Sequence, residues 1–567
     1  MSLIDWIVFS ITILCIIAYG IWKSRGTNTI SGYFLADRKL PWYHVGLSVM
    51  ATQASAITYL SAPGQAYSDG IRFVQFYFGL PLAMIFLCIF FLPGFKKWNV
   101  FTAYEYLEDR FDNKTRSLTA LLFLLQRGIS TGITIYAPSI ILSSILGIDI
   151  YYVIICTGVM VVGYTVFGGT KAVSYTQKLQ MGVIFASLFI VFYQLIRFLP
   201  EGVTLGDSLH LAGKMGKLNA IDLTFDLNNK YNIWSGIIGG FFLQLSYFGT
   251  DQSQVGRYLT GKSVDESRLG LMMNGLIKIP MQFFILLLGV MVFAFYQFHT
   301  PPMYFNERQE EKILLSPLKS QYQQVATEYN AVQSEKKEPI RAMLQAMQVE
   351  DKAGIEKAGS QLQLLETKAK TVKSKAVHLL ADSGLTSDAD DTNYIFLYFI
   401  TKTLPIGIIG LLMAVILLAA MGATAGGLSA LTSTTVMDFL RRFGKGPVTN
   451  DLNSSRWTTV AWGAFCILVA LYAGRMGNLI EAVNILGSLF YGVILGIFVT
   501  AFFLKKISGN AVFYAAILAE IFVVISWWTE LTAFLWLNLI GCLLVLFFAF
   551  IIQLIFPEKT KKDLPPG

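Results

Sequence analysis

Long runs of apolar residues alternate with short charged loops along almost the whole chain. Each run holds roughly 20 residues, the length that an α-helix needs to cross the hydrocarbon of a bilayer. The pattern therefore predicts an all-α, polytopic membrane protein with about 13 transmembrane helices. We expect the spans to be centred near residues 13, 53, 84, 132, 160, 187, 243, 284, 419, 464, 492, 518 and 543.

The second of these runs departs from the pattern, because Ala51–Gly70 is rich in small and polar residues and we expect it to be broken at Pro63–Gly64. Polar groups and unpaired backbone are costly in hydrocarbon unless they line a cavity. An interrupted polar helix among apolar spans predicts a substrate and ion site at mid-membrane. The alternative is close helix packing through small residues. The polar residues of this run are Thr52, Gln53, Ser55, Thr58, Ser61 and Gln65.

One segment, residues 299–390, is charged and contains no spanning run. Its apolar residues recur every three or four positions in two stretches, 318–332 and 358–379, which is typical of an antiparallel helical hairpin. Glu338–Pro339 suits a break between the arms. This insert is either a solvated decoration or a docking arm for a protein partner or for self-association.

The composition supports a membrane protein, since 54% of the residues are hydrophobic and only 14% are charged. The net charge of +8 comes from Lys and Arg in every second loop. Because basic residues collect on the cytoplasmic side, we expect the N-terminus outside, the C-terminus in the cytoplasm and the insert outside a cell (inner) membrane. The basic segments are 23–40, 96–116, 257–268, 441–456, 505–506 and the tail.

Other function classes find little support in the residues. The five cysteines and four histidines are scattered, so neither a zinc site nor a nucleophilic triad can be built, and the basic loops are explained without nucleic acid. We expect no enzyme activity and no cofactor. A transporter-like membrane sensor is a second possibility, but it would need an output module, and the tail after Pro557 is short.

Five stretches in order resemble the sodium/solute symporter family, over about residues 30–300 and 395–505, and most of all its iodide, monocarboxylate and vitamin branch. They read AYEYLEDRF, STGITIYAPSIILSSILGIDI, YTVFGGTKAVSYTQKLQ, SYFGTDQSQVGRYLTGKS and LPIGIIGLLMAVILLAAM. The resemblance implies a leucine-transporter-like fold with two inverted repeats of five helices. It also implies alternating access and the sodium-coupled symport of a small solute.

The resemblance also implies a division of the chain. An extra N-terminal helix and basic loop would occupy 1–40, and the first repeat 41–200. The second repeat would comprise 230–298 and 391–506, on either side of the 299–390 insert. Two additional helices and a short cytoplasmic tail would form 507–567.

In the family, sodium is held by carbonyl groups at positions that match Ala51, Ala54 and Ala419. The family's pair of hydroxyl ligands falls, without gaps, on Gly422 and Ala423, which have no side-chain oxygen. A shift of one residue would bring Ala423 and Thr424 to these positions and restore one hydroxyl. Fewer oxygen ligands would weaken the sodium site.

A second departure lies in the sixth span, where the family's Trp-Thr-Asp is replaced by a sequence containing Gln177 and Lys178, while Gln180 keeps a common polar residue. Lys178 has three readings. It can be a lysine that reaches the lipid headgroups, or its ammonium can replace sodium in a proton-coupled or uncoupled carrier, or it can pair with an acid elsewhere.

The family pattern matches several positions to the solute pocket, and Arg127 adds an intramembrane cation that could bind an anionic solute. Each could instead be a helix–helix hydrogen bond. Gln75 and Asp251 are weaker candidates. Carriers of sugars, carboxylates, vitamins, amino acids and halides share this fold, so the sequence does not identify the solute. The matched solute-binding positions are Gln53, Thr58, Gln244, Tyr247, Lys278 and Asn484.

Overall fold

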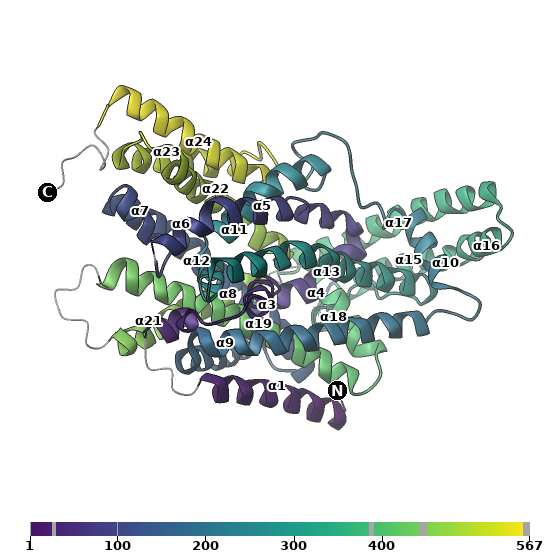
Figure 1. Ribbon diagram of the computed structural model, residues 1–567. Helices are drawn as coiled ribbons and strands as arrows, with labels where there is room; N and C mark the ends of the chain where they lie inside the picture. Colours follow the sequence, from purple (N-terminus) through teal and green to yellow (C-terminus); the bar gives the residue numbers. More distant parts are fainter. Residues whose placement is uncertain (1, 25–29, 99, 385–389, 442–450, 559–567) are drawn as a thin grey trace.

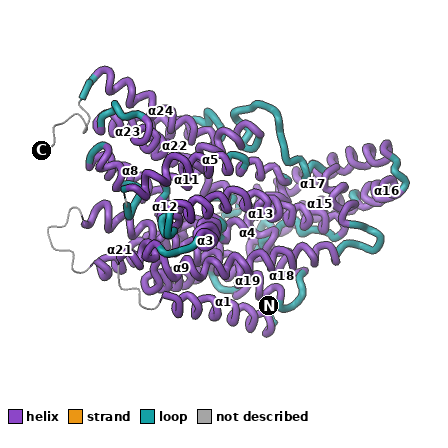
Figure 2. The backbone as a smooth tube through the Cα atoms, in the orientation of Figure 1, coloured by secondary structure: helices purple, strands orange, loops and turns teal. Residues whose placement is uncertain are grey.

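The computed structural model describes residues 2–24, 30–98, 100–384, 390–441 and 451–558. Within these ranges the regular structure is helical, and no strand is present (Figure 2). The first half contains α1 Leu3–Ser24, α2 Ile30–Leu35, η1 Ala36–Arg38, α3 Trp42–Gln53, α4 Ala56–Asp69, η2 Ile71–Tyr77, α5 Leu80–Phe86, η3 Leu87–Phe91, α6 Leu92–Lys97, α7 Glu105–Arg110, α8 Asn113–Leu146, α9 Ile150–Arg197, α10 Leu205–Lys214, η4 Ser235–Gly239, α11 Gly240–Thr250, α12 Gln252–Tyr258 and α13 Val264–Phe298.

The second half contains the helices of the insert and those that complete the bundle. They are α14 Glu307–Leu314, α15 Lys319–Glu335, α16 Lys337–Gln348, α17 Lys352–Asp382, α18 Thr392–Thr403, α19 Ile408–Thr434, η5 Thr435–Leu440, α21 Asp451–Tyr472, η6 Ala473–Arg475, α22 Leu479–Phe503, α23 Gly509–Trp528 and α24 Phe534–Ile555.

Ten helical stretches of the described residues are long and apolar enough to cross a membrane. The three other expected spans are short or broken helices, namely Ile150–Val166, α3 with α4, and α11 with α12. The expected all-helical polytopic fold is confirmed. The spans lie side by side in one bundle, from which the insert projects at one end (Figure 1). We call this end the insert side.

Helix α9 contains two spans rather than one. The hydroxyl groups of Tyr164 and Thr176 lie 2.9 Å apart, although residues 12 positions apart in a straight helix are separated by about 18 Å. The chain therefore folds back between these two residues, and Val173–Arg197 runs back across the bundle.

The first broken helix is interrupted at Ala54 and Ser55, and the expected break at Pro63–Gly64 is wrong. Ser55 adopts an extended backbone conformation, and α4 starts at Ala56 and continues through Pro63. A proline removes one backbone donor, but membrane helices tolerate this where neighbouring groups satisfy the freed carbonyl. The true break leaves the carbonyl groups of Ala51 and Thr52 without a backbone donor among the described residues.

A second broken helix lies at Asp251, which has an extended backbone conformation between α11 and α12. The two interruptions, at Ala54 and at Asp251, occur in the helices that open the two expected repeats. Interrupted helices in corresponding positions of two halves are characteristic of inverted-repeat transporters.

The insert forms four helices, α14–α17, rather than a simple hairpin. The expected seam exists, since Tyr322, Tyr329 and Val332 of α15 and Ala369 and Val372 of α17 share one buried cluster. Pro339 does not separate the arms, because it lies in the first turn of α16, and the chain turns back between α16 and α17 instead, where Glu350 has a positive φ. Proline is tolerated in a first turn, where its missing N–H would have no helical partner.

The insert contacts the end of α4. Lys370 of α17 donates to the carbonyl of Ser68 at 3.0 Å. Lys217 of the loop after α10 donates to the carbonyls of Tyr67 and Ser68 at 2.8 and 2.7 Å. These ammonium groups satisfy carbonyls that have no partner at a helix C-terminus.

Helix α1 is joined to α19 through a single carboxylate. Oδ1 of Asp5 accepts hydrogen bonds from the backbone N–H groups of Gly407 at 2.6 Å and of Gly410 at 3.2 Å. Its other oxygen accepts from the backbone N–H and the hydroxyl of Ser2, both at 2.8 Å. Asp5 therefore caps the N-terminus of a helix to which it does not belong.

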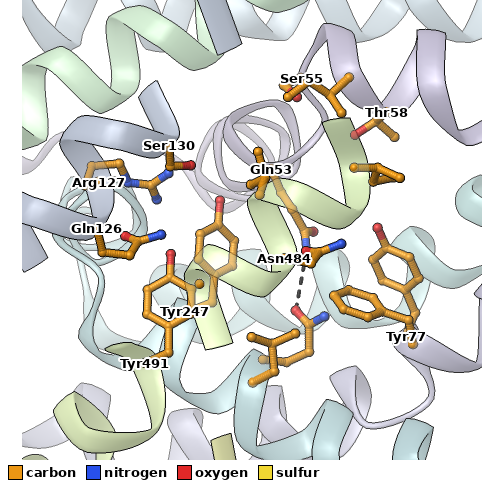
Figure 3. A pocket seen from close by; sticks show the side chains of 17 residues that line it. Gln53, Ser55, Thr58, Tyr77, Gln126, Arg127, Ser130, Tyr247, Asn484 and Tyr491 are labelled. Carbon is orange, nitrogen blue, oxygen red and sulfur yellow. Dashed lines mark hydrogen bonds between the residues drawn. The ribbon is translucent and has the colours of Figure 1, made fainter. Parts of the chain in front are cut away.

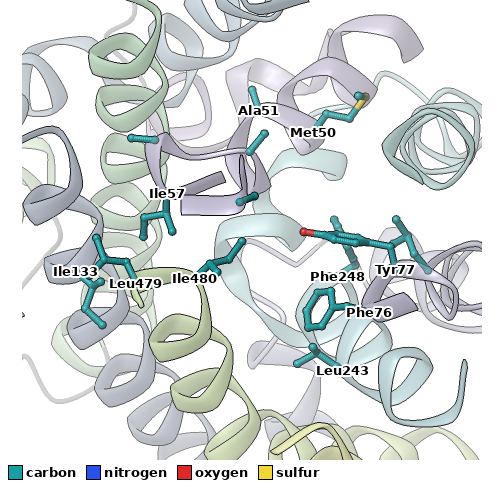
Figure 4. Close-up of a cluster of buried hydrophobic side chains, with 14 of the residues drawn as sticks. Met50, Ala51, Ile57, Phe76, Tyr77, Ile133, Leu243, Phe248, Leu479 and Ile480 are labelled. Carbon is teal, nitrogen blue, oxygen red and sulfur yellow. The ribbon is translucent and has the colours of Figure 1, made fainter. Parts of the chain in front are cut away.

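Apolar side chains enclose the first break (Figure 4). Ala51 and Ile57, on either side of the break, are buried, and they belong to the same cluster as Tyr77 and Ile480. Since this packing comes from separate helices, the interrupted backbone is held away from lipid.

Candidate functional site

A cavity of about 100 Å³ lies at the first broken helix and against α11. Its walls come from α3 and α4, η2, α8, α11 and α22, so four distant parts of the chain meet here (Figure 3). The polar residues of the lining are Gln53, Ser55, Thr58, Tyr77, Gln126, Arg127, Ser130, Gln244, Tyr247, Asn484 and Tyr491.

One wall carries an ion pair. Nη2 of Arg127 lies 2.5 Å from Oδ2 of Asp251, and this carboxylate also accepts a hydrogen bond from the hydroxyl of Tyr491 at 2.7 Å. Arg127 also donates to the hydroxyl of Ser253. The carboxylate at the second helix break is therefore bound to α8 and α22, and the pair contributes no net charge to the cavity.

Aromatic rings surround this pair. The guanidinium of Arg127 lies 5.5 Å from the ring centre of Tyr247, whose hydroxyl accepts from Nε2 of Gln254 at 2.6 Å. The rings of Tyr247 and Tyr491 are 5.8 Å apart. A cation over an aromatic face is stabilised by the ring quadrupole, so the position of Tyr247 is fixed at both its ring and its hydroxyl.

Several polar atoms at the cavity are buried without a partner among the described residues. They are Nε of Arg127, both side-chain polar atoms of Gln126 and Oε1 of Gln53. The amide of Gln53 makes one long bond, from Nε2 to Oε1 of Gln244 at 3.4 Å (Figure 3). Buried polar groups are normally paired, so unpaired donors and acceptors facing a cavity indicate a ligand or water.

The structure brings together most of the residues proposed from the sequence. The cavity lining includes Gln53, Thr58, Gln244, Tyr247, Asn484 and Arg127. Asp251 stands directly behind Arg127.

Two of the proposed residues lie elsewhere. Lys278 of α13 is outside the lining, and its ammonium lies 5.7 Å from the ring centre of Tyr77, a lining residue. Gln75 bonds to the backbone of Tyr231 and Asp222 and so joins η2 to the loop between α10 and η4.

Sequence reasoning missed Gln126, Ser130, Tyr77 and Tyr491. Gln126 precedes Arg127 in an otherwise apolar stretch, and this polar pair is a signal that could have indicated it. Tyr77 and Tyr491 carry no such signal, because an aromatic residue in a membrane helix is equally suited to ordinary packing.

A second polar junction joins α3, α9 and α19. The hydroxyl of Ser48 donates to Oε1 of Gln177 at 2.6 Å, and Nε2 of Gln177 lies 3.2 Å from Oγ1 of Thr52 and 3.4 Å from the carbonyl of Gly422. The amide of Gln177 therefore lies between the broken helix and the facing helix. The oxygens around it come from hydroxyl and carbonyl groups, which suit a hard cation such as sodium.

The face that α19 presents to this junction contains glycines. A Cβ at Gly422 would meet Oε1 of Gln180 at 2.7 Å, and a Cβ at Gly426 would meet Thr52 and Arg257. Thr424 lies two positions beyond Gly422, about 200° around the helix, and its buried hydroxyl has no partner among the described residues.

The other proposed ion-site residues lie near these positions in the chain. Ala51 and Ala54 flank the break, and both are buried. Ala419 and Ala423 are also buried, three positions before and one position after Gly422. Lys178 does not enter the junction, since its ammonium lies 5.2 Å from the ring centre of Tyr43, a residue that is 40% exposed.

A helical bundle with two interrupted helices and a polar cavity beside them defines a multi-pass membrane protein of the transporter class. In the part of the chain that the structure describes, no group of three or more His, Cys, Asp or Glu side chains could hold a metal ion. The model of the sodium:solute symporter family matches residues 33–307 and 374–519. The chain belongs to this family, as expected from its motifs.

Curated relatives in this family are sodium-coupled transporters. The chain is 31% identical over 301 residues to a human sodium/iodide cotransporter, and the aligned region covers 52% of this chain and 45% of the relative. It is 33% identical over 273 residues to a human sodium-coupled monocarboxylate transporter 1. That match covers 48% of this chain and 44% of the relative. The chain thus spans about half the length of the curated relatives that it matches.

The fold is also similar to that of a solved structure, a Na⁺-coupled sialic acid symporter in a substrate-bound outward-open state. The two chains superimpose with a TM-score of 0.75 over 99% of each, at 21% sequence identity. This similarity supports the leucine-transporter-like architecture.

Proposed function

We propose that the protein is a sodium-coupled symporter that carries a small polar solute across the membrane by alternating access, and that it is not an enzyme. The observation that carries this proposal is the cavity, which lies at one interrupted helix and touches the Arg127–Asp251 pair at the other. Helices broken near the bilayer centre supply the backbone groups that bind solute and ion in such carriers.

The junction around Gln177 supports sodium as the coupling ion. Oxygens are available from Thr52 and from the carbonyl of Gly422, and the break frees the carbonyl of Ala51. Ala54, Ala419 and Ala423 belong to the set proposed from the family pattern. Thr424 is the weakest member of this set, because it lies about 200° around α19 from Gly422. The names of the sodium-coupled relatives agree with this choice.

The proton-coupled alternative has less support, because it needs Lys178 at the ion position. Its ammonium instead lies over the ring of Tyr43. This position suits a lysine that reaches the membrane surface.

The cavity limits the size of the solute. Its volume of about 100 Å³ is smaller than the roughly 150 Å³ cavity that accommodates benzene. We therefore infer a solute of at most about six non-hydrogen atoms in this conformation. The unpaired donors of Gln126 and Arg127 suit an acceptor group such as a carboxylate or a carbonyl. Small monocarboxylates fit these limits better than sugars do.

For the orientation, we infer that the insert is extracytoplasmic and the C-terminus cytoplasmic in the cell membrane. Helix α1 begins on the insert side, and α24 ends on the opposite side (Figure 1). The basic segment before α8, which includes α7, also lies opposite the insert (Figure 1), in agreement with the preference of Lys and Arg for the cytoplasmic face.

Uptake by the purified full-length protein in liposomes tests the proposal. The solutes would be small monocarboxylates, halides, small amino acids and glucose, each under a sodium gradient and, separately, under a proton gradient. We expect a sodium gradient to drive uptake of a small solute. Uptake that ignores sodium and follows the proton gradient would contradict the proposed coupling.

A further inference from the structure

Arg257 of α12 is a buried cation without a carboxylate partner. Only 2% of the residue is exposed. Arg116 is paired with Asp438 and Glu108, and Arg127 with Asp251, but no acid among the described residues forms an ion pair with Arg257. An isolated charge in a low-dielectric interior is strongly unfavourable unless an opposite charge or several polar groups compensate it.

The polar contacts of this guanidinium are few. Its Nη1 lies 3.5 Å from the hydroxyl of Ser174, which is the outer limit of a hydrogen bond. Its Nη2 points toward α19, because a Cβ at Gly426 would meet it at 3.0 Å. Neither neighbour carries a negative charge.

A small space adjoins the guanidinium. It has a volume of about 20 Å³ and lies between α2, α12 and α19. This is enough for about one water-sized particle and too little for a carboxylate or a phosphate. Its lining residues are Phe34, Gln252, Ser253, Gly256, Arg257, Gly426, Ser429, Ala430 and Ser433.

The free polar groups around this space are mainly donors. The hydroxyl of Ser429 is buried and has no partner among the described residues. Ser433 already donates to the carbonyl of Ala430 at 3.0 Å, and both ends of the Gln252 amide are bonded to backbone groups of the loop at 101–103. A particle in this space would meet the guanidinium and the Ser429 hydroxyl, both of which can donate to it.

We infer that this space is a binding site for a monatomic anion, a halide such as chloride, which compensates the charge of Arg257 and accepts a hydrogen bond from Ser429. A water molecule fits the same volume, but it cannot neutralise the guanidinium. The site goes beyond the proposed transport function, because the need for a counter-charge is the same whichever ion drives the carrier.

The site also has a consequence for the coupling junction. Gly426 lies against both Arg257 and Thr52, so the guanidinium stands close to the oxygens proposed for sodium. Two nearby cations repel each other at low dielectric. A bound halide would remove this repulsion, and we therefore expect chloride to strengthen sodium binding.

The test measures the thermal unfolding midpoint of the purified full-length protein in sodium-free buffer, with choline chloride or choline gluconate at equal ionic strength. A ligand that binds only the folded state raises the midpoint as its concentration increases. We expect a saturable increase with chloride, and the same with bromide. Because sodium is absent, failure here would overturn the anion site and leave the proposed sodium coupling untouched.

Variants of Ser429 test whether the anion binds at this position. Ser429→Ala should weaken chloride binding about tenfold, since a hydrogen bond to a charged group is lost. Ser429→Asp and the isosteric Ser429→Asn should both fill the space and remove the response to chloride. Only the carboxylate of Ser429→Asp pairs with Arg257, so this variant should have the higher midpoint in the absence of chloride. Ser139→Ala is the matched control, because the hydroxyl of this buried serine donates to the carbonyl of Ile135 in α8.

Crystals grown with bromide provide a measurement that does not depend on any variant folding. An anomalous peak next to Arg257 is expected. A water molecule at this position, or a midpoint that responds to chloride equally in the wild type and in Ser429→Asp, would overturn the inference.

Discussion

Arg127 and Asp251 form an ion pair of 2.5 Å that joins α8 to the break between α11 and α12. The carboxylate is fully buried, and Tyr491 of α22 donates to it. Three helices therefore meet at one carboxylate beside the cavity. A movement of α8 or α22 would therefore act through this carboxylate on the second broken helix.

Removing one partner of this pair should be costly. Asp251→Leu leaves a buried guanidinium unpaired and should lower the free energy of unfolding by about 3 to 5 kcal/mol. The double variant Arg127→Met with Asp251→Leu should recover most of this loss. Denaturant titration in detergent gives the stability, and liposome uptake gives the activity. If the double variant also transports normally, Arg127 does not contact the solute.

Tyr247 should be needed for transport but not for insertion into the membrane. Tyr247→Ala removes the ring beside Arg127 and the hydroxyl that Gln254 binds, so uptake should be lost. Tyr247→Phe keeps the ring and should retain part of the activity. Tyr472→Ala, at a residue of α21 that is 64% exposed, is the matched control. Equal uptake by Tyr247→Ala and the control would place the site elsewhere.

Gln53 should affect solute affinity. Its Oε1 is buried without a partner, and its Nε2 makes only a long bond, so both groups can contact the solute. Gln53→Ala should raise the Michaelis constant of uptake several-fold, to the extent of about one hydrogen bond. Initial rates across a range of solute concentrations measure this change, and an unaltered constant would exclude the contact.

The sodium dependence of uptake should require Gln177 more than it requires Thr424 or Lys178. Gln177→Met removes the amide between Thr52 and Gly422 and should abolish stimulation by sodium. Thr424→Val should have a smaller effect, because Thr424 is about 200° around α19 from Gly422. Lys178→Ala should keep sodium-stimulated uptake. Loss of stimulation in Lys178→Ala, together with uptake that depends on pH, would favour the proton-coupled carrier.

Lys217 should produce a pH dependence of stability. The residue is 4% exposed, and burial lowers its pKa to about 8 from the ordinary lysine value of 10.5. Between these values the unfolded state binds more protons, so the free energy of unfolding should rise with pH over this window. Lys217→Met should flatten the increase, whereas Lys214→Met, at a more exposed lysine paired with Glu356, should not. Thermal midpoints from pH 7 to 10.5 measure it.

The orientation of the insert can be tested at Ser334, an exposed residue near the end of α15. A cysteine at this position should react with an impermeant thiol reagent in intact cells or spheroplasts. The wild-type chain, with its five native cysteines, gives the background. Labelling that requires disruption of the membrane would contradict the proposed orientation.

The spans and the family could be predicted from the sequence because they depend on runs and motifs that lie together in the chain. The polar character of 51–70 correctly predicted an interrupted helix, but not the position of the break. Pro63 attracted attention as a helix breaker, yet α4 continues through it and the chain breaks at Ala54 and Ser55 instead. Tertiary contacts decide such a case, since a neighbouring helix can satisfy the backbone group that proline frees.

The composition of the cavity was only partly predictable for a similar reason. Gln53 and Tyr247 could be found from the family pattern, but Tyr491 is recognised only when its bond to Asp251 is seen. Lys278 matches the pattern, yet it is not part of the cavity lining, and its ammonium lies 5.7 Å from the ring centre of Tyr77. Which side of a helix a residue occupies relative to a distant neighbour depends on how the helices pack.

The hydrogen bonds of Asp5 have a consequence for biogenesis. Its donor at Gly407 follows 402 residues later in the chain. At a synthesis rate of about 5 to 20 residues per second, the ribosome needs roughly 20 to 80 s to reach it. During this interval Ser2 can serve one carboxylate oxygen, while the other depends on water or on the insertion machinery. The hydrogen bonds of α1 are therefore completed only when α19 arrives, and a nascent chain that stalls before Gly407 would expose this unfinished end.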